Sequence, residues 1–282
     1  MQEELRVSDV KNPVSIRDVS WMKQKMIPVN GVQPKIFVED GQNTYLLKFS
    51  ITRLSRRPIP HHISEYISCK VIKSLGYAVQ DVELVSYEGK IGVLINLFSQ
   101  QFITFIGLGD GTLSGSNLGY DLDSLYQMLG TDKFSNECEI YLWDTFILDA
   151  FVNNLDRHPN NWGFFSVSDG YVLAPLIDLG HSLFSLNAYN VARMQDIDNY
   201  MFRYGNSSIN CQGNESRRFR DIIKNENNPI FLERLKIFKG RLNLLDLSAI
   251  DLVHIVEPFL TEYCDFLRRY FNNQIAWFNK LE

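Results

Sequence analysis

An acidic and an amide residue in one polar loop are the first feature of this sequence that could carry chemistry. Asp156 and Asn161 lie five positions apart in the stretch NNLDRHPNN, which follows a long apolar run. A carboxylate beside a hydroxyl can accept its proton, and an amide oxygen can bind a hard metal ion. Aspartate and asparagine are also ordinary turn formers, so this spacing alone does not separate a site from a loop.

A second acidic loop follows one hairpin later. The chain runs through WGFFSV, a turn at 168–170 and YVLAPLI, and then reaches Asp178-Leu179-Gly180. Such a hairpin returns Asp178 to the side of the first loop, and the glycine lets the backbone turn away. Protein kinases place a D-x-x-x-x-N loop and a D-x-G loop around magnesium and the ATP phosphates in this way. The two loops together predict phosphoryl transfer, with Asp156 as the base and with Asn161 and Asp178 as magnesium ligands.

An upstream lysine and glutamate add a third part to this prediction. Lys48 lies in the strand-like run TYLLKFSI, and Glu65 lies on the helix expected after it. In kinases a strand lysine, oriented by a helix glutamate, holds the α- and β-phosphates. Each residue alone could equally be a solvated surface charge. His158, beside the candidate base, is interpreted as ordering the loop, with direct catalysis or metal binding as the alternative.

The elements that must position these residues follow from the hydrophobic pattern. Residues 35–51 and 81–98 each predict two strands around a turn, and residues 62–75 predict an amphipathic helix between them. Glycines and serines mark 101–121 as a linker, after which a buried helix is expected at 136–152. Two or three amphipathic helices should end the chain. We therefore expect an α+β, two-lobed fold with a β-rich ATP-binding lobe at 1–100, the linker, and a helical catalytic lobe at 122–282.

Composition limits the function classes further. Apolar residues make up 45% of the chain and the formal net charge is −5, which favours a globular protein with a sizeable core over a general nucleic-acid binder. No apolar stretch is long enough to cross a bilayer, and MQEELRVSDVKN lacks the apolar core of a secretory signal. The four cysteines show no metal-ligand spacing. We expect a cytoplasmic protein with reduced thiols and no membrane span, with a specialised export route as the alternative.

Three segments carry a family resemblance. NNLDRHPNNWGFF, APLIDLGHSLF and NGVQPKIFV resemble the catalytic loop, the metal loop and the phosphate-loop region of HipA-like serine/threonine kinases. SEYISCKVIKSLG is similar to the helix of the short, CtkA-type members. The resemblance implies a two-lobed kinase-like fold, ATP and Mg²⁺ as cofactors, and a protein substrate with a serine or threonine acceptor. It also implies an antitoxin-type or host protein as a further partner.

The resemblance assigns the nucleotide-binding residues by position. Lys48 would contact phosphate with support from Glu65, and His158 would lie beside the nucleotide in the catalytic loop. The residues over the phosphates and along the adenine-facing hinge would be Asn30, Gly31, Val32 and Gln33, and Asn96, Leu97 and Phe98.

The sequence differs from related kinases in two respects, and two other functions remain open. The expected phosphate loop holds only Gly31, where protein kinases proper use G-x-G-x-x-G. The chain also begins close to that loop, so we expect no counterpart of the extra N-terminal subdomain of full-length HipA toxins. The same loops would serve a kinase for a small molecule or a lipid head group, and a kinase fold that has lost activity could act as a binding module.

We predict that autophosphorylation, if it occurs, falls outside the phosphate loop. The resemblance implies that such kinases can silence themselves through a loop serine, but Trp21 to Asn43 contains no serine or threonine. Phosphate should instead appear in segments such as 112–124 or 205–216 and should leave ATP affinity unchanged. Mass spectrometry after incubation with MgATP, with nucleotide binding measured before and after phosphatase, checks this. Phosphate on Ser20 or Thr44 that blocks ATP binding would contradict it.

Overall fold

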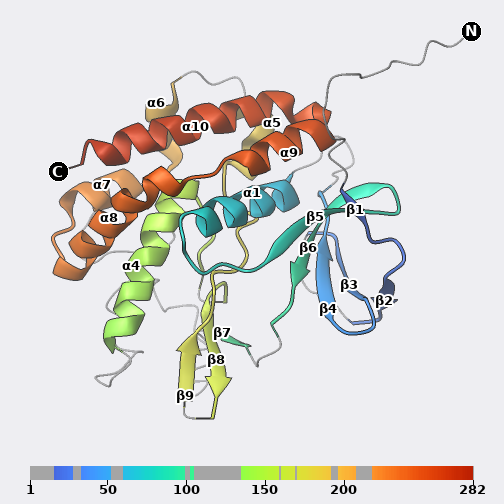
Figure 1. The fold of residues 1–282 in the computed structure, drawn as a ribbon. Coiled ribbons are helices and arrows are strands. Elements are labelled where there is room, and N and C mark those ends of the chain that lie inside the picture. The colour runs from blue at the N-terminus through green and yellow to red at the C-terminus, as the bar shows by residue number, and fades with distance from the viewer. Residues whose placement is uncertain are drawn as a thin grey trace, which may run out of the picture.

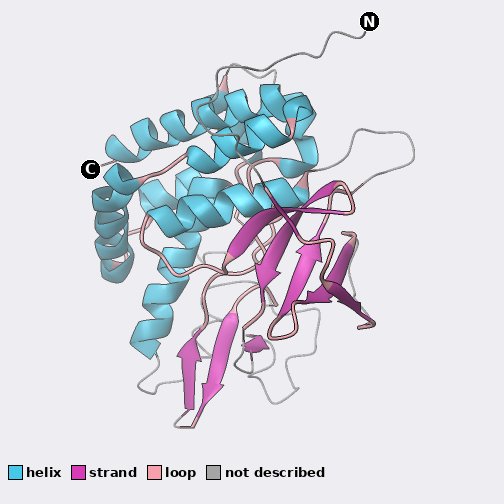
Figure 2. Ribbon diagram, turned by 45° about the vertical axis from the view of Figure 1, so that its right-hand side comes forward, coloured by secondary structure: helices cyan, strands magenta, loops and turns pink. Residues whose placement is uncertain are grey.

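The structure is a computed structural model that describes most of the chain. The described residues are 16–27, 33–51, 60–98, 102–104, 135–158, 160–168, 170–191, 196–207 and 218–281. Strands and helices separate in space: the N-terminal strands lie together on one side, and the helices that follow residue 135 lie on the other (Figures 1 and 2). This is the mixed α+β, two-part arrangement that the sequence predicts.

A six-stranded sheet forms the N-terminal part, in the order β1-β5-β6-β4-β3-β2. Its strands are β1 (Arg17–Asp18), β2 (Lys23–Lys25), β3 (Lys35–Glu39), β4 (Thr44–Lys48), β5 (Val82–Tyr87) and β6 (Lys90–Asn96). The β3–β4 hairpin closes on Asp40, whose carboxylate accepts the backbone N–H groups of Gln42 and Asn43. All neighbouring strands are antiparallel except β1, which pairs with β5 in parallel.

Helix α1 (His61–Ser74) packs against β5 and β6 on one face of this sheet. Its apolar residues are fully buried at steps of four, with Ile63, Ile67 and Val71 at 0% exposure. The opposite face of the sheet carries a separate apolar cluster that includes Leu47, Val38 and Tyr87. The strands therefore place alternate side chains in two environments.

The C-terminal part is built around α4 (Ser135–Val152), which is buried along most of its length. The surrounding helices are α5 (Ala188–Val191), α6 (Ile197–Tyr204), α7 (Phe219–Asn225), α8 (Pro229–Arg241), α9 (Ser248–Val256) and α10 (Thr261–Asn279), with single 3₁₀ turns η1 (Ser185–Asn187), η2 (Leu242–Leu244) and η3 (Pro258–Leu260). Phe151 of α4 packs against Phe238 of α8 and Phe271 of α10. Aromatic packing of this kind makes α4 a rigid base for the loop that follows it.

A three-stranded sheet, β7-β8-β9, lies below the helices in Figure 1. It consists of β7 (Phe102–Thr104), β8 (Gly163–Val167) and β9 (Gly170–Leu173). The approach of β7 requires glycine at position 163, because a Cβ there would lie 2.1 Å from the Ile103 carbonyl oxygen. Residues 102–104, placed in a linker by the sequence, thus pair with the hairpin that joins the two acidic loops.

The chain after β9 returns to the N-terminal part through the backbone. Leu176 forms a parallel bridge with Val79, and Gln80 donates its backbone N–H to the Leu176 carbonyl at 2.8 Å. This contact fixes the segment that leads into Asp178 against the segment that leads into β5. The contact therefore places the second acidic loop, which contains Asp178, beside α1 and β4.

The elements expected from the pattern are confirmed. Hairpins occur at β3–β4, β5–β6 and β8–β9, and helices occur at α1 and α4 within a residue or two of the expected limits. The described C-terminal residues form α9 and α10 with η3 between them. No helix in the described ranges is long and apolar enough to cross a membrane.

Candidate active site

A lysine held between two carboxylates lies at the centre of the site. Lys48 Nζ is 2.9 Å from Glu65 Oε1 and 3.0 Å from Asp178 Oδ1. Lys48 comes from β4, Glu65 from α1, and Asp178 from the loop after β9. The fold therefore brings together three residues that the sequence singled out, although the first and the last are 130 positions apart.

The exposure of the three side chains differs sharply. Lys48 is 5% exposed and Glu65 is fully buried, whereas the Asp178 side chain is 47% exposed. Burial opposes the charged form of Lys48, but the carboxylates of Glu65 and Asp178 outweigh it and raise the pKa of the lysine. The surrounding protein also opposes ionisation of Asp178, yet the Lys48 ammonium lowers the pKa of that carboxyl. Burial raises the pKa of Glu65 in spite of the attraction of Lys48.

Neighbouring groups hold Glu65 in place. The side-chain amide of Gln80 donates to Glu65 Oε1 at 2.7 Å, and Gln80 itself is fixed by the backbone bond to Leu176. Gly180 passes close to α1, where an added Cβ would lie 3.6 Å from the His61 carbonyl oxygen and 3.8 Å from Glu65 Oε2. The glutamate is thus oriented from the sheet side and enclosed by the acidic loop.

The loop around Asp178 is held in an unusual backbone conformation. Asp178, Leu183 and Phe184 have φ angles of 53°, 52° and 60°, in the left-handed region. Such angles persist only where the surroundings fix them. The Leu183 N–H donates to the Val152 carbonyl at 2.8 Å, and the Tyr263 hydroxyl donates to the Leu183 carbonyl at 2.6 Å. These bonds fix the backbone at Leu183, at the end of the acidic loop, against α4 and α10.

The first acidic loop is organised by a buried ion pair. Arg157 is 1% exposed and pairs with Asp149 of α4, its Nε lying 2.9 Å from Asp149 Oδ2. The same guanidinium donates to the carbonyls of Asn161 and Ile177, at 2.5 and 2.9 Å. One side chain thus connects α4, the first loop and the residue before Asp178. The attraction of Asp149 raises the pKa of Arg157 although burial opposes it.

Asp156 lies at the surface of this loop beside a histidine pair. Its side chain is 41% exposed, and Asp156 Oδ2 lies 3.4 Å from His181 Nδ1. The His181 ring stacks on the His61 ring with centroids 4.5 Å apart. His61 Nδ1 lies 2.9 Å from both the Gly180 carbonyl and Ser185 Oγ, and burial lowers the pKa of His61 to about 4. The neutral His61 ring therefore supports His181 against one oxygen of Asp156.

The two proposed magnesium ligands offer a donor set that fits the ion. Asn161 donates its side-chain N–H to the Asp156 carbonyl at 2.8 Å, which leaves its amide oxygen as an acceptor. That oxygen and the Asp178 carboxylate are hard donors of the kind magnesium prefers. Among the described residues no group of three or more His, Cys, Asp or Glu could hold a metal unaided. A magnesium ion here would take its other ligands from phosphates and water.

The nucleotide-contact residues expected from the resemblance fall in several places. Gln33 donates its side-chain amide to the Phe49 carbonyl at 3.0 Å, so it ties the start of β3 to the end of β4. His158 accepts the Asn160 N–H at 3.2 Å, a bond inside the loop. Asn30, Gly31 and Val32 lie outside the described residues.

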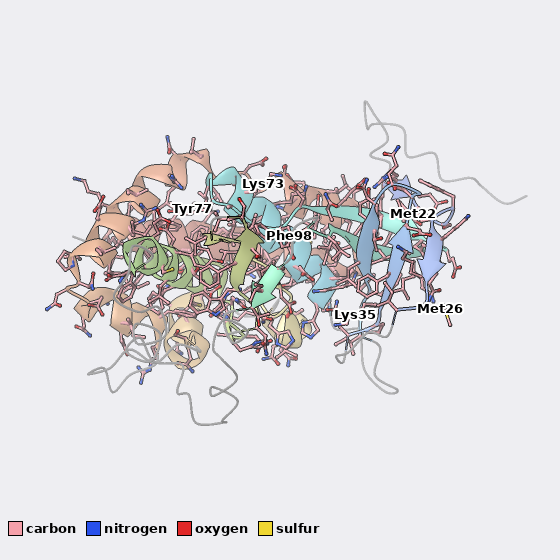
Figure 3. The ribbon with its side chains drawn as sticks, turned by 90° about the horizontal axis from the view of Figure 1, so that it is seen from below. Met22, Met26, Lys35, Lys73, Tyr77 and Phe98 are labelled. Carbon is pink, nitrogen blue, oxygen red and sulfur yellow. The ribbon has the colours of Figure 1, made fainter. Side chains whose placement is uncertain are left out.

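The expected hinge lies at the end of β6. Asn96 is the last residue of that strand, and Leu97 is 37% exposed. Phe98 packs edge-on against Phe165 of β8, with centroids 4.7 Å apart. Viewed from below, Phe98 lies between the N-terminal strands and the helical part (Figure 3). Contact of these three residues with adenine stays a prediction.

Sequence reasoning missed the supporting residues. Arg157, Gln80 and His181 make the bonds that orient Asn161, Glu65 and Asp156. One signal was visible for the buried pair: Asp149 is an acid in the most apolar stretch of the helix, near its end, and Arg157 follows in the loop after it. An acid in such a helix requires a partner. Gln80 and His181 gave no comparable signal.

A family model and a curated relative each match most of this chain. The family model described as HipA-like C-terminal domain matches residues 27–228. A curated protein, "Serine/threonine-protein kinase CtkA" of Helicobacter pylori, is 24% identical over 246 residues, covering 81% of this chain and 74% of its own length.

Two solved structures share the fold. The crystal structure of the H. pylori proinflammatory kinase CtkA matches with a TM-score of 0.78 at 22% identity, covering 93% of this chain and 94% of that one. HipA of Shewanella oneidensis, solved with HipB and operator DNA, matches with a TM-score of 0.59 at 13% identity. That match covers 90% of this chain but only 65% of the HipA chain.

We predict that Arg157→Met destabilises the protein by about 3–5 kcal/mol, because Asp149 would be left as a buried, unpaired carboxylate. Urea denaturation measures the change. Arg268→Met is the matched control, since Arg268 pairs with the exposed Asp251 and Asp265 and should cost about 1 kcal/mol or less. Equal stability of the two variants would show that the buried pair does not organise the loop.

Proposed function

The chain belongs to the HipA-like C-terminal domain family, and we propose on that basis that it is a serine/threonine protein kinase that uses MgATP. The observation that carries the proposal is the Lys48 ammonium held between Glu65 and Asp178. A helix glutamate, a strand lysine and a D-x-G aspartate in mutual contact form the arrangement that protein kinases need for phosphoryl transfer. The named relative supplies the acceptor class, a protein hydroxyl.

Each residue then has a role set by its position. Lys48 is buried and charged, so it would neutralise and orient the α- and β-phosphates. Asp178 and the amide oxygen of Asn161 would hold magnesium, which supplies positive charge to the transferring phosphoryl group. The partial exposure of Asp178 leaves its carboxylate accessible from the side opposite Lys48.

Asp156 is the proposed proton acceptor. The acceptor hydroxyl would attack the γ-phosphorus and pass its proton to a carboxylate oxygen of Asp156. The bond from the γ-phosphorus to the β–γ bridging oxygen would break, and ADP would leave. His181 lies beside Oδ2, so the other oxygen is available to the hydroxyl. His181 acts in this scheme as a positioning residue, because it keeps the carboxylate from rotating away. Positioning of this kind is where most of the catalytic gain in phosphoryl transfer arises.

The reaction is proposed to take place in the cytoplasm on a protein substrate. S. oneidensis HipA was solved with its partner HipB, and an antitoxin-type or host partner for this chain is a proposal from that likeness. Transfer to a small molecule or a lipid head group is the alternative, since the same loops serve several acceptors. The acceptor class can be separated by experiment.

Incubation of the protein with γ-labelled ATP, magnesium and a cell lysate tests the proposal. We expect label in the protein fraction, on serine or threonine, and none above background in lipid or metabolite fractions. Asp156→Asn should lower turnover by about 10²- to 10⁴-fold and keep MgATP affinity within a few-fold, because it removes proton acceptance and leaves the nucleotide contacts. Label confined to lipids or metabolites would overturn the acceptor class.

Asp178→Asn should behave differently from Asp156→Asn. Loss of the charged ligand should weaken nucleotide binding in a magnesium-dependent way as well as abolish turnover. Calorimetric titration of ATP with and without magnesium measures this, with Asp156→Asn as the control of equal charge change. An unchanged magnesium dependence would remove Asp178 from the metal site.

Lys48 and Glu65 should behave as one unit. Lys48→Met should lower kcat/KM strongly, and Glu65→Gln should lower it less, because Asp178 still holds the lysine. The double variant should be no worse than Lys48→Met alone, since the glutamate acts through the lysine. Circular dichroism must show that each variant is folded, because Lys48→Met leaves Glu65 buried without its cation. Additive losses in kcat/KM would contradict the coupling.

A further inference from the structure

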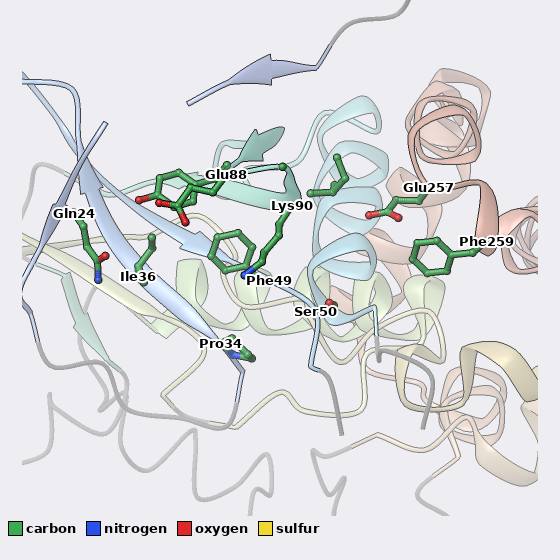
Figure 4. Close-up of a pocket in the computed structure, with 12 residues that line it drawn as sticks. Gln24, Pro34, Ile36, Phe49, Ser50, Glu88, Lys90, Glu257 and Phe259 are labelled. Atoms are coloured by element: carbon green, nitrogen blue, oxygen red, sulfur yellow. The ribbon is translucent and has the colours of Figure 1, made fainter. Parts of the chain in front are cut away.

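A cavity of about 610 Å³ lies between the outer face of the N-terminal sheet and the segment after α9. Its walls come from both parts of the molecule (Figure 4). The sheet contributes Gln24, Pro34, Ile36, Phe49, Ser50, Tyr87, Glu88, Gly89, Lys90 and Ile91, and the C-terminal part contributes Glu257 and Phe259. The volume is within the range of sites that bind small organic ligands.

The cavity is separate from the candidate active site. Leu47 lies in the apolar cluster on the outer face, and Phe49 packs against that cluster, whereas Lys48 between them points inward to Glu65. Successive side chains of a strand face opposite sides of the sheet. The cavity therefore shares the end of β4 with the active site but opens on the other face.

Glu257 is the feature that gives the cavity a chemical preference. The residue is 9% exposed, and in Figure 4 its carboxylate points toward the strands. Within the described part of the chain no hydrogen bond or ion pair reaches that carboxylate. Burial alone raises the pKa of Glu257 to about 7. A carboxyl so placed gains stability when a cation binds beside it.

The walls around this carboxyl are apolar and aromatic. Phe259 lies next to Glu257 and is 57% exposed, and Phe49 lies on the sheet side (Figure 4). Ile91 of β6 also lines the cavity. Phe49 and Tyr87 pack with ring centroids 6.2 Å apart. Aromatic faces attract organic cations and also bury apolar carbon. They therefore favour a ligand that carries a positive charge on an apolar body.

Among the described residues, the cation that lines the cavity does not pair with Glu257. Lys90 lines the cavity with its side chain beside the Phe49 ring (Figure 4), and no ion pair in the described ranges joins it to Glu257. Among the described lining residues, Lys90 and Glu88 are the other charged groups, one of each sign. At the end of the cavity lined by Glu257, this carboxylate therefore determines that a positively charged ligand is favoured.

We propose that this cavity is a binding site for an organic cation, one ammonium or guanidinium group on an apolar body. The charged group would bond to the Glu257 carboxylate, and the apolar body would lie against Phe259, Phe49 and Ile91. The proposal does not depend on the kinase assignment. The same chemistry could be presented by a free amine or by a basic side chain of a peptide beside an aromatic residue.

The site can be tested by adding phenethylammonium to the full chain. Calorimetry measures the affinity, and amide NMR shifts at residues 257, 259 and 91 locate the bound ligand. We expect binding to phenethylammonium and binding about tenfold weaker to neutral 2-phenylethanol, the loss that removal of a charge-assisted hydrogen bond produces. Glu257→Gln should weaken phenethylammonium about tenfold and leave 2-phenylethanol unchanged. Acetyl-Phe-Arg-amide forms the second arm, and tighter Glu257-dependent binding of the peptide would assign the ligand to a protein segment.

Glu262→Gln is the matched control, because Glu262 is an exposed glutamate five residues away on α10. It should leave both affinities unchanged. Equal binding of the cation and the alcohol, or shifts that avoid the three positions, would overturn the proposal. The comparison of the two ligands on the unmodified protein decides the question even if Glu257→Gln does not fold.

Discussion

The contact of Lys48 with Glu65 and Asp178 is the constraint on which the rest of the site depends. A lysine that is 5% exposed cannot stay charged without nearby anions, and a fully buried glutamate cannot stay charged without a cation. β4, α1 and the loop after β9 must therefore be assembled together. The Leu176–Val79 bridge and the Gln80 bonds provide the backbone frame for that assembly. The two parts of the molecule meet at the Lys48 ammonium, which pairs with Glu65 of the N-terminal part and with Asp178 of the C-terminal part.

Supporting and reacting groups differ in their access to water. Asp149 and Arg157 are almost fully buried, and their geometry is fixed by four hydrogen bonds from one guanidinium. Asp156 and Asp178, which would meet the hydroxyl and the metal, keep 41% and 47% of their side-chain exposure. A buried, fully bonded pair can hold an exposed carboxylate in place without blocking it. This separation explains why the first acidic loop can be polar, exposed and still ordered.

The sequence predicted those features that local pattern determines. The hairpins, α1 and α4 have periodicities and turns within a few residues, and Asp156, Asn161 and Asp178 belong to short motifs. The Lys48–Glu65 contact could be predicted from order along the chain because strand and helix are adjacent. Gln80 and His181 could not, because their partners lie far along the chain and their neighbours have no distinctive composition. The pairing of residues 102–104 with β8 was missed for the same reason, since it depends on a glycine 59 or more positions away.

Glu257 differs from Glu65 and Asp149 because, among the described residues, no cation pairs with its carboxylate. Among the described residues, the buried carboxylates of Glu65 and Asp149 each contact a cation, as expected if burial is to be tolerated. Glu257 is 9% exposed and lies beside aromatic side chains and a cavity, and no cation of the described residues pairs with it. In the described ranges this carboxylate makes no bond, so the contacts described in the fold do not by themselves account for a carboxyl at this position. The organic cation proposed above would give this carboxylate a partner.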